Sequence, residues 1–90
     1  MMEPREVKIK RLAMRSMRRG IKEMDLILSA FAEKNLSALA DEDLSLYDQL
    51  LSENDHDLYN WVSGQSSAPE AYGNLMAEIT KGAHGLTRPN

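Results

Sequence analysis

The sequence predicts an all-α protein, a small five-helix bundle. Apolar residues recur at intervals of three and four over several segments, which is the spacing of one helix face. No segment alternates apolar and polar residues as a strand does, and no Asn-Gly or Asp-Gly pair marks a hairpin. Short connections separate the periodic segments, and Gly20, Gly64 and Pro69 mark two of them. The 90 residues suffice for one domain.

The first two helices are expected to meet at a glycine. Residues 4–18 form the first, because Pro4 suits a first helical position and no helix breaker occurs before Gly20. A break is expected around Gly20, since glycine costs about 1 kcal/mol relative to alanine inside a helix. The strongest periodic pattern then runs from Ile21 to about Lys34. Its inward positions are Ile21, Met24, Ile27, Leu28 and Phe31.

The third and fourth helices are shorter. Acidic residues at the start of residues 41–52 favour the positive N-terminal end of a helix there. Asn54 or Asp55 can cap the fourth helix, since a side-chain oxygen accepts hydrogen bonds from free backbone N–H groups of the first turn. Gly64 is a natural stop for this helix, because glycine readily adopts the left-handed conformation found past helix ends.

A fifth helix is expected to open at Pro69 and to end at Gly82, with apolar residues at helical spacing between them. Residues 1–82 are therefore predicted to form a single helical domain. Residues 83–90 contain few apolar side chains and are predicted to form a flexible C-terminal tail.

Composition argues against catalysis by this chain. The absence of cysteine excludes a disulfide scaffold, a thiolate metal site and a cysteine nucleophile. His56 lies in an acidic turn where a capping or structural role is expected, and His84 is expected to be solvated. No serine belongs to a nucleophile motif, so we expect no catalytic residue and no metal site. Trp61 is expected in the core, and an exposed Trp61 would indicate an interface residue instead.

Charge is divided unevenly along the chain. The segment through Lys22 carries eight basic and two acidic residues, a net charge of +6, and the remainder carries three basic and twelve acidic residues, a net charge of −9. Such a division indicates a charged binding surface. One alternative is that these side chains only solvate a helix. A second is a nucleic-acid-binding module that uses the basic N-terminal helix, although the acidic remainder would repel phosphates.

The most informative segment is the turn between the first two helices, Arg18-Arg19-Gly20-Ile21-Lys22-Glu23-Met24-Asp25. Gly20 permits close approach of another backbone, and Arg19 offers a planar head with five donors. Glu23 follows four residues later and can hold or compete for Arg19. We expect the guanidinium and the carboxylate to point outward. The alternative is an ordinary surface ion pair, worth under ~1 kcal/mol.

These residues resemble the FAD assembly factors of succinate dehydrogenase, the succinate dehydrogenase assembly factor 2 family. The family's hallmark, Arg-Gly-x-x-Glu, is matched by Arg19, Gly20 and Glu23. The likeness continues through the aliphatic helix that follows. It resumes in Leu46-Tyr47-Asp48-Gln49-Leu50-Leu51 and in Asp55-His56-Asp57-Leu58-Tyr59-Asn60-Trp61, which is similar to the family's Asp-x-Asp-Leu-Tyr-x-Trp turn. The resemblance covers roughly residues 11–64, and no letters after Gly64 are matched.

The resemblance implies a chaperone rather than an enzyme. Such a protein binds the flavoprotein subunit of succinate dehydrogenase, or of fumarate reductase, and promotes covalent attachment of FAD to a histidine of that subunit. It would hold no cofactor stably, because the FAD is attached to the partner. The hallmark residues Arg19, Gly20 and Glu23 would lie at the interface, and we group the neighbouring Arg18 and Asp25 with them.

The expected location is the bacterial cytoplasm. No apolar run approaches the ~18 residues that a membrane span needs, and no long Arg- and Ser-rich presequence precedes the domain. We therefore expect a soluble protein that does not insert into a membrane. A mature mitochondrial form whose presequence has been removed is the alternative.

Overall fold

The computed structural model describes residues 3–83. Within this range the chain forms five α-helices and two short 3₁₀ turns, with no strand, so the predicted all-α five-helix bundle is confirmed. The helices are α1 (Arg5–Arg15), α2 (Lys22–Asn35), α3 (Asp41–Leu50), α4 (Asp55–Ser63) and α5 (Gly73–Ala83). The 3₁₀ turns are η1 (Leu36–Ala38) and η2 (Glu70–Tyr72). None of the helices in the described range has the length and apolar content needed to span a membrane.

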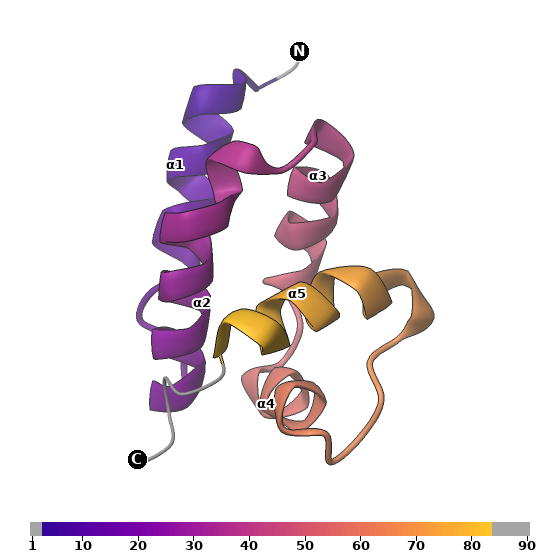
Figure 1. Cartoon of the computed structure of the whole chain (residues 1–90). Coiled ribbons are helices and arrows are strands. Elements are labelled where there is room, and N and C mark those ends of the chain that lie inside the picture. The colour runs from indigo at the N-terminus through magenta and orange to yellow at the C-terminus, as the bar shows by residue number, and fades with distance from the viewer. Residues whose placement is uncertain (1–2, 84–90) are drawn as a thin grey trace.

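The bundle is organised around α2, which packs against α1, α4 and α5. Figure 1 shows α1, α2 and α3 upright, with α5 crossing below their middle and α4 seen end-on beneath it. α1 lies against both α2 and α3 and runs in the same direction as α3. The turn between α1 and α2 therefore lies near the end of α3 and the start of α4.

The core is apolar and is supplied unevenly by the helices. α2 contributes five buried side chains, whereas Leu12 is the one buried apolar side chain of α1. The predicted inward residues of α2 are buried except Ile21, which precedes the helix as its N-cap and is half-buried. The fully buried apolar residues are Leu12, Met24, Leu28, Leu36, Leu44, Tyr47, Leu50, Leu58 and Ile79.

The predicted break between the first two helices is confirmed, but its geometry differs from expectation. α1 ends at Arg15, three residues before the predicted end at residue 18. The residue in the left-handed conformation is Arg18, with a φ of 55°, and not Gly20. A helix cannot continue through a residue with positive φ, which is why α1 stops early.

The other helix boundaries follow the sequence closely. Asn54 caps α4 by accepting a hydrogen bond from the backbone N–H of His56, and Gly64 ends the helix with a φ of 83°. Pro69 precedes η2, so α5 begins four residues later than predicted. The stop expected at Gly82 is wrong, since α5 runs to the buried Ala83. The rest of the predicted tail, with His84, lies outside the described residues.

Trp61 lies at the edge of the core. It is half-buried and packs against the buried residues, with its ring 6.1 Å from that of Tyr72. The tyrosine is itself buried, and its hydroxyl donates a hydrogen bond of 3.0 Å to a carboxylate oxygen of Glu53. The tryptophan thus joins α4 to the segment that leads into α5.

Candidate partner-binding surface

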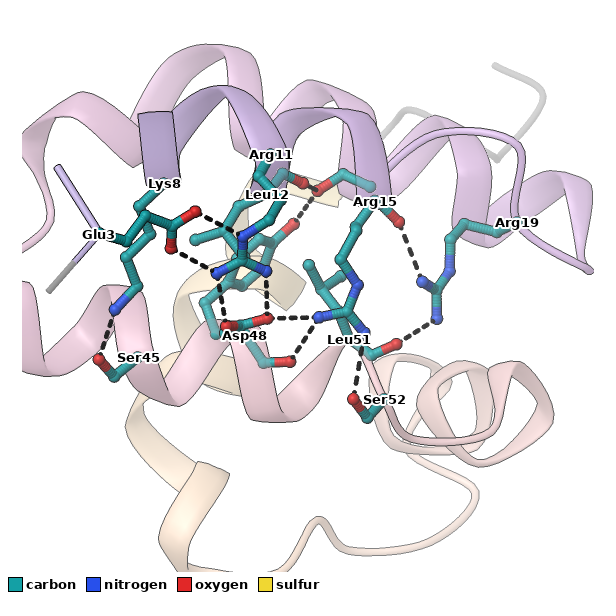
Figure 2. Close-up of polar contacts among 12 residues, drawn as sticks. Glu3, Lys8, Arg11, Leu12, Arg15, Arg19, Ser45, Asp48, Leu51 and Ser52 are labelled. Carbon is teal, nitrogen blue, oxygen red and sulfur yellow. Dashed lines mark hydrogen bonds and ion pairs between the residues drawn. The ribbon is translucent and has the colours of Figure 1, made fainter. Parts of the chain in front are cut away.

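Arg19 is turned into the protein, which corrects the expectation that it points outward. Its side chain is 12% exposed. Nε donates to Oδ1 of Asp55 at 2.9 Å, and Nη1 and Nη2 donate to the backbone carbonyls of Arg15 and Leu51 at 3.0 and 3.1 Å. Figure 2 shows the two carbonyl contacts, which come from the end of α1 and the residue after α3. The guanidinium therefore fastens the turn to the bundle.

Glycine is needed at position 20 because the side chain of Asp55 lies close to the backbone there. Its backbone N–H donates to Oδ2 of Asp55 at 2.6 Å, while Oδ1 of the same carboxylate holds Arg19. A Cβ atom on Gly20 would lie 3.0 Å from Oδ2 of Asp55. This separation is tighter than an ordinary van der Waals contact, so a side chain there would displace the carboxylate. Asp55, expected as a possible cap and as part of the matched Asp-x-Asp-Leu-Tyr-x-Trp turn, is the residue that orders the turn between α1 and α2.

Arg18 and Asp25 form a second brace within the turn. The backbone N–H of Arg18 donates to Oδ1 of Asp25 at 3.0 Å, and Ser29 Oγ donates to the same oxygen at 3.2 Å. The side chain of Arg18 is exposed, whereas that of Asp25 is half-buried. Asp25 thus holds the backbone of Arg18 in its left-handed conformation and leaves the guanidinium at the surface.

Glu23 is exposed and makes no ion pair with Arg19. The expected competition between the two side chains is therefore absent, and so is the ordinary surface ion pair considered as its alternative. Of the five predicted site residues, Arg18, Gly20 and Glu23 reach the surface. Asp25 accepts a hydrogen bond from within the turn, and Arg19 is held by Asp55 at the start of α4. Sequence spacing could not show this division, because Asp55 is distant along the chain.

A row of polar contacts joins α1 and the turn after it to α3 and the start of α4, and we refer to it as the polar ladder. Figure 2 shows its middle part, from Lys8 to Ser52. Every contact joins residues more than thirty positions apart in the sequence. Successive residues from Arg5 to Arg19 contact successive residues from Asp41 to Asp55, as expected for segments that run in the same direction. The pairs are Arg5–Asp41 at 2.7 Å, Lys8–Ser45 at 2.7 Å, Arg11–Asp48 at 2.8 Å, Arg15–Asp48, Arg15–Ser52 at 3.1 Å and Arg19–Asp55 at 2.7 Å. The charge asymmetry of the sequence is thus partly matched inside the molecule.

Asp48 is the most heavily bonded carboxylate of the polar ladder. Hydrogen bonds from Arg11, with the nearby charge of Arg15, hold the pKa of Asp48 below its ordinary range. Arg11 also binds Glu3, at 2.9 Å, and these two carboxylates raise the pKa of the guanidinium. The charged forms of the acids and the base are therefore favoured together.

A neutral pair lies beneath the polar ladder. The hydroxyls of Ser16 and Tyr47 are 2.6 Å apart, and Ser16 Oγ also donates to the carbonyl of Leu12 at 2.8 Å. Both side chains are fully buried, and burial raises the pKa of Tyr47 to about 12. This pair closes the end of α1 onto α3 and gives the turn a rigid base.

The comparisons with known proteins agree with the motif. Residues 10–83 match the family described as flavinator of succinate dehydrogenase. The chain belongs to this family. The match runs past residue 64 and includes α5, so the absence of matched letters in the last helix did not mark the end of the likeness.

Curated relatives carry the same designation. Over 61 residues the chain is 52% identical to succinate dehydrogenase assembly factor 2, mitochondrial, of Meyerozyma guilliermondii, covering 68% of this chain and 45% of the relative. Over 92 residues it is 39% identical to succinate dehydrogenase assembly factor 2-A, mitochondrial, of Drosophila persimilis, covering 96% of this chain and 58% of the relative. The chain thus spans about half the length of these relatives.

Two sequence-based expectations change with these findings. The expected cytoplasmic location is wrong, because the relatives are named mitochondrial proteins and point to the mitochondrion. The nucleic-acid-binding alternative has no support from the family. Four arginines of its proposed basic surface, Arg5, Arg11, Arg15 and Arg19, are paired with carboxylates of the chain itself.

Proposed function

We propose that this chain is an assembly factor that binds the flavoprotein subunit of succinate dehydrogenase, or of fumarate reductase, and promotes covalent attachment of FAD to that subunit. The family match over residues 10–83 carries the proposal. The names of the relatives, all succinate dehydrogenase assembly factors, support it. The chain would act as a helper of a partner enzyme rather than as an enzyme.

The structure supports a role in positioning. The turn after α1 is braced by Asp55, Asp25 and the buried Ser16–Tyr47 pair. A rigid surface of this kind can hold the acceptor region of the partner and its flavin in a reactive arrangement, since correct placement removes much of the entropic barrier to bond formation. In this proposal Arg18, Gly20 and Glu23 contact the partner, and Arg19 and Asp25 maintain the shape of the turn.

We further propose that FAD stays with the partner throughout. The described residues form helices only, whereas the common dinucleotide-binding folds are built on a parallel sheet with a glycine-rich turn. Titrating free FAD with the purified chain, and following flavin fluorescence, should give no saturable change at micromolar concentrations. Tight saturable binding would contradict this part of the proposal.

The main test is reconstitution. The apo flavoprotein subunit is incubated with FAD, with or without the chain, and covalent flavin is read by in-gel fluorescence after denaturing electrophoresis. We expect the chain to raise the rate or the yield of covalent flavin, and heat-denatured chain serves as the control. Equal covalent flavin in the presence and absence of the folded chain would contradict the proposal.

A further inference from the structure

α1 presents three faces. One carries the cations of the polar ladder, and a second carries Leu12 and Ser16 into the core. The third holds Val7, Lys10 and Met14 at the helical spacing i, i+3 and i+7. Met17 lies two residues past the end of α1, where its backbone N–H donates to the carbonyl of Met14 at 3.2 Å. We refer to these four residues as the outer stripe.

The outer stripe is apolar and faces solvent. Val7, Met14 and Met17 are 52%, 73% and 51% exposed, and they account for three of the four large exposed apolar side chains of the described chain. Single exposed apolar residues are common, but three of them along α1 and the turn that follows it mark an interaction surface. Methionine suits such a surface, because its flexible side chain adapts to a partner and it is enriched at interfaces.

The eight cations of the segment through Lys22 fall into two groups. Five of the eight contact acceptors in the polar ladder. Lys10, Arg18 and Lys22 are exposed and have no ion pair within residues 3–83. Because the other five cations are bound to acceptors of the chain, the exposed charges of Lys10, in the outer stripe, and Arg18, next to Met17 in sequence, suit a partner that carries carboxylates around an apolar patch.

Arg18 provides an independent observation. Its φ of 55° lies in the region that glycine adopts without steric cost, whereas a side chain is disfavoured there. The hydrogen bond from its N–H to Asp25 maintains this conformation, and the guanidinium remains exposed. Backbone strain of this kind is concentrated at functional positions, so the cation at residue 18 calls for a role outside the fold.

We propose that the outer stripe, together with Arg18, is the surface that docks on the flavoprotein subunit, with Arg18 pairing with a carboxylate of that partner and Met14 and Met17 filling the apolar centre of the contact. The inference rests on the proposed function, because it names the partner from that function. It extends the contact with the partner from the turn onto α1, while Arg19 acts as an internal brace.

The test compares variants of the purified chain in calorimetric titrations with the apo flavoprotein subunit. Arg18→Gly removes the cation and relieves the left-handed strain, and Met14→Ser with Met17→Ser removes the apolar centre. We expect each to bind about tenfold more weakly or worse than the original chain. Arg18→Gly should melt at the same temperature as the original chain or higher, which separates a contact role from a structural one.

Matched controls accompany both changes. Lys81→Ala removes an exposed cation from the last turn of α5, and Met14→Leu with Met17→Leu keeps the stripe apolar. Both controls should bind within about twofold of the original chain. Raising the salt concentration should weaken binding of the original chain more than that of Arg18→Gly, because the lost ion pair is screened by salt.

Two results would overturn the inference and they are distinguishable. If the original chain binds and Arg18→Gly and the double serine variant bind as tightly, the docking surface lies elsewhere and the proposed function stands. If the original chain does not bind the flavoprotein subunit at all, the inference fails together with the proposed function.

Discussion

The two sides of the bundle are held together by different forces. α2 meets α5 and α4 through buried apolar side chains such as Leu28, Ile79 and Leu58. α1 meets α3 largely through the polar ladder, and Leu12 is the one buried apolar side chain that it adds. Apolar burial supplies most of the stability of a small domain, whereas exposed ion pairs add little. The comparison indicates that α2 and α5 stabilise the fold while α1 is aligned by specific polar pairs.

The largest effect is expected in the apolar half. Leu28→Ala should lower the free energy of unfolding by about 2–5 kcal/mol, because the side chain is fully buried and its loss leaves a cavity. Leu26→Ala, on the same helix but 48% exposed, should change it by about 0.5 kcal/mol or less. Urea denaturation measures both. Equal losses in the two variants would mean that α2 does not face the core as described.

Arg19→Ala tests the most buried contact of the polar ladder. We expect a loss of about 2–3 kcal/mol, since the change leaves the carboxylate of Asp55 and two carbonyls with fewer donors in a largely buried place. Glu23→Ala, which removes the other charged hallmark residue, should stay within about 0.5 kcal/mol of the original chain. The two can be compared by thermal unfolding. A neutral Arg19→Ala would indicate that Arg19 points outward after all.

Gly20→Ala and Gly73→Ala form a pair with opposite expected signs. The first should destabilise the fold by about 1–2 kcal/mol, because the new Cβ approaches Oδ2 of Asp55 and the carboxylate is held in place by Arg19 at Oδ1 and by the N–H of residue 20 at Oδ2. The second should stabilise it by up to about 1 kcal/mol, since Gly73 lies in a helical conformation and its Cβ would meet nothing within 4 Å. Chemical denaturation gives both values. A stabilised Gly20→Ala would contradict the close approach.

The smallest effect concerns pH. The pKa of Asp48 is lower in the folded chain than in the unfolded chain, so its stabilising contribution is complete above its unfolded pKa, near 4, and is lost as pH falls through the folded value. The Asp48→Asn variant should therefore be less stable than the original chain at pH 7, and its free energy of unfolding should fall less steeply between about pH 5 and pH 2. Asp43→Asn, an exposed acid on the same helix, should keep the decline. Unfolding free energies measured across this range decide the matter.

Much of the fold could be predicted because its signals are local. The inward spacing of Met24, Leu28 and Phe31, the Asn54 cap and the Gly64 stop each depend on residues within one or two helical turns. The boundary at Arg15 was missed, since nothing near Arg18 in the sequence marks a left-handed residue. Its conformation depends on the carboxylate of Asp25, seven residues away.

The motif was enough to locate the candidate site, but it did not show which side chains bind one another there. Arg19, Gly20 and Glu23 could be found from the hallmark spacing, yet Glu23 is the nearest carboxylate in sequence and Asp55 is the one that binds. The cations of α1 and the polar residues at 41, 45, 48, 52 and 55 share a three-and-four spacing, and this matched pattern was the signal that could have indicated the polar ladder.

The amino-acid order alone thus determined the helices, their break and the family motif, because these rest on contacts between residues close along the chain. Tertiary packing decided which charged side chains pair with one another within the molecule and which remain unpaired at its surface. Side chains more than thirty residues apart meet only when α1 lies alongside α3. That placement depends on the whole buried core, and no local pattern specifies it.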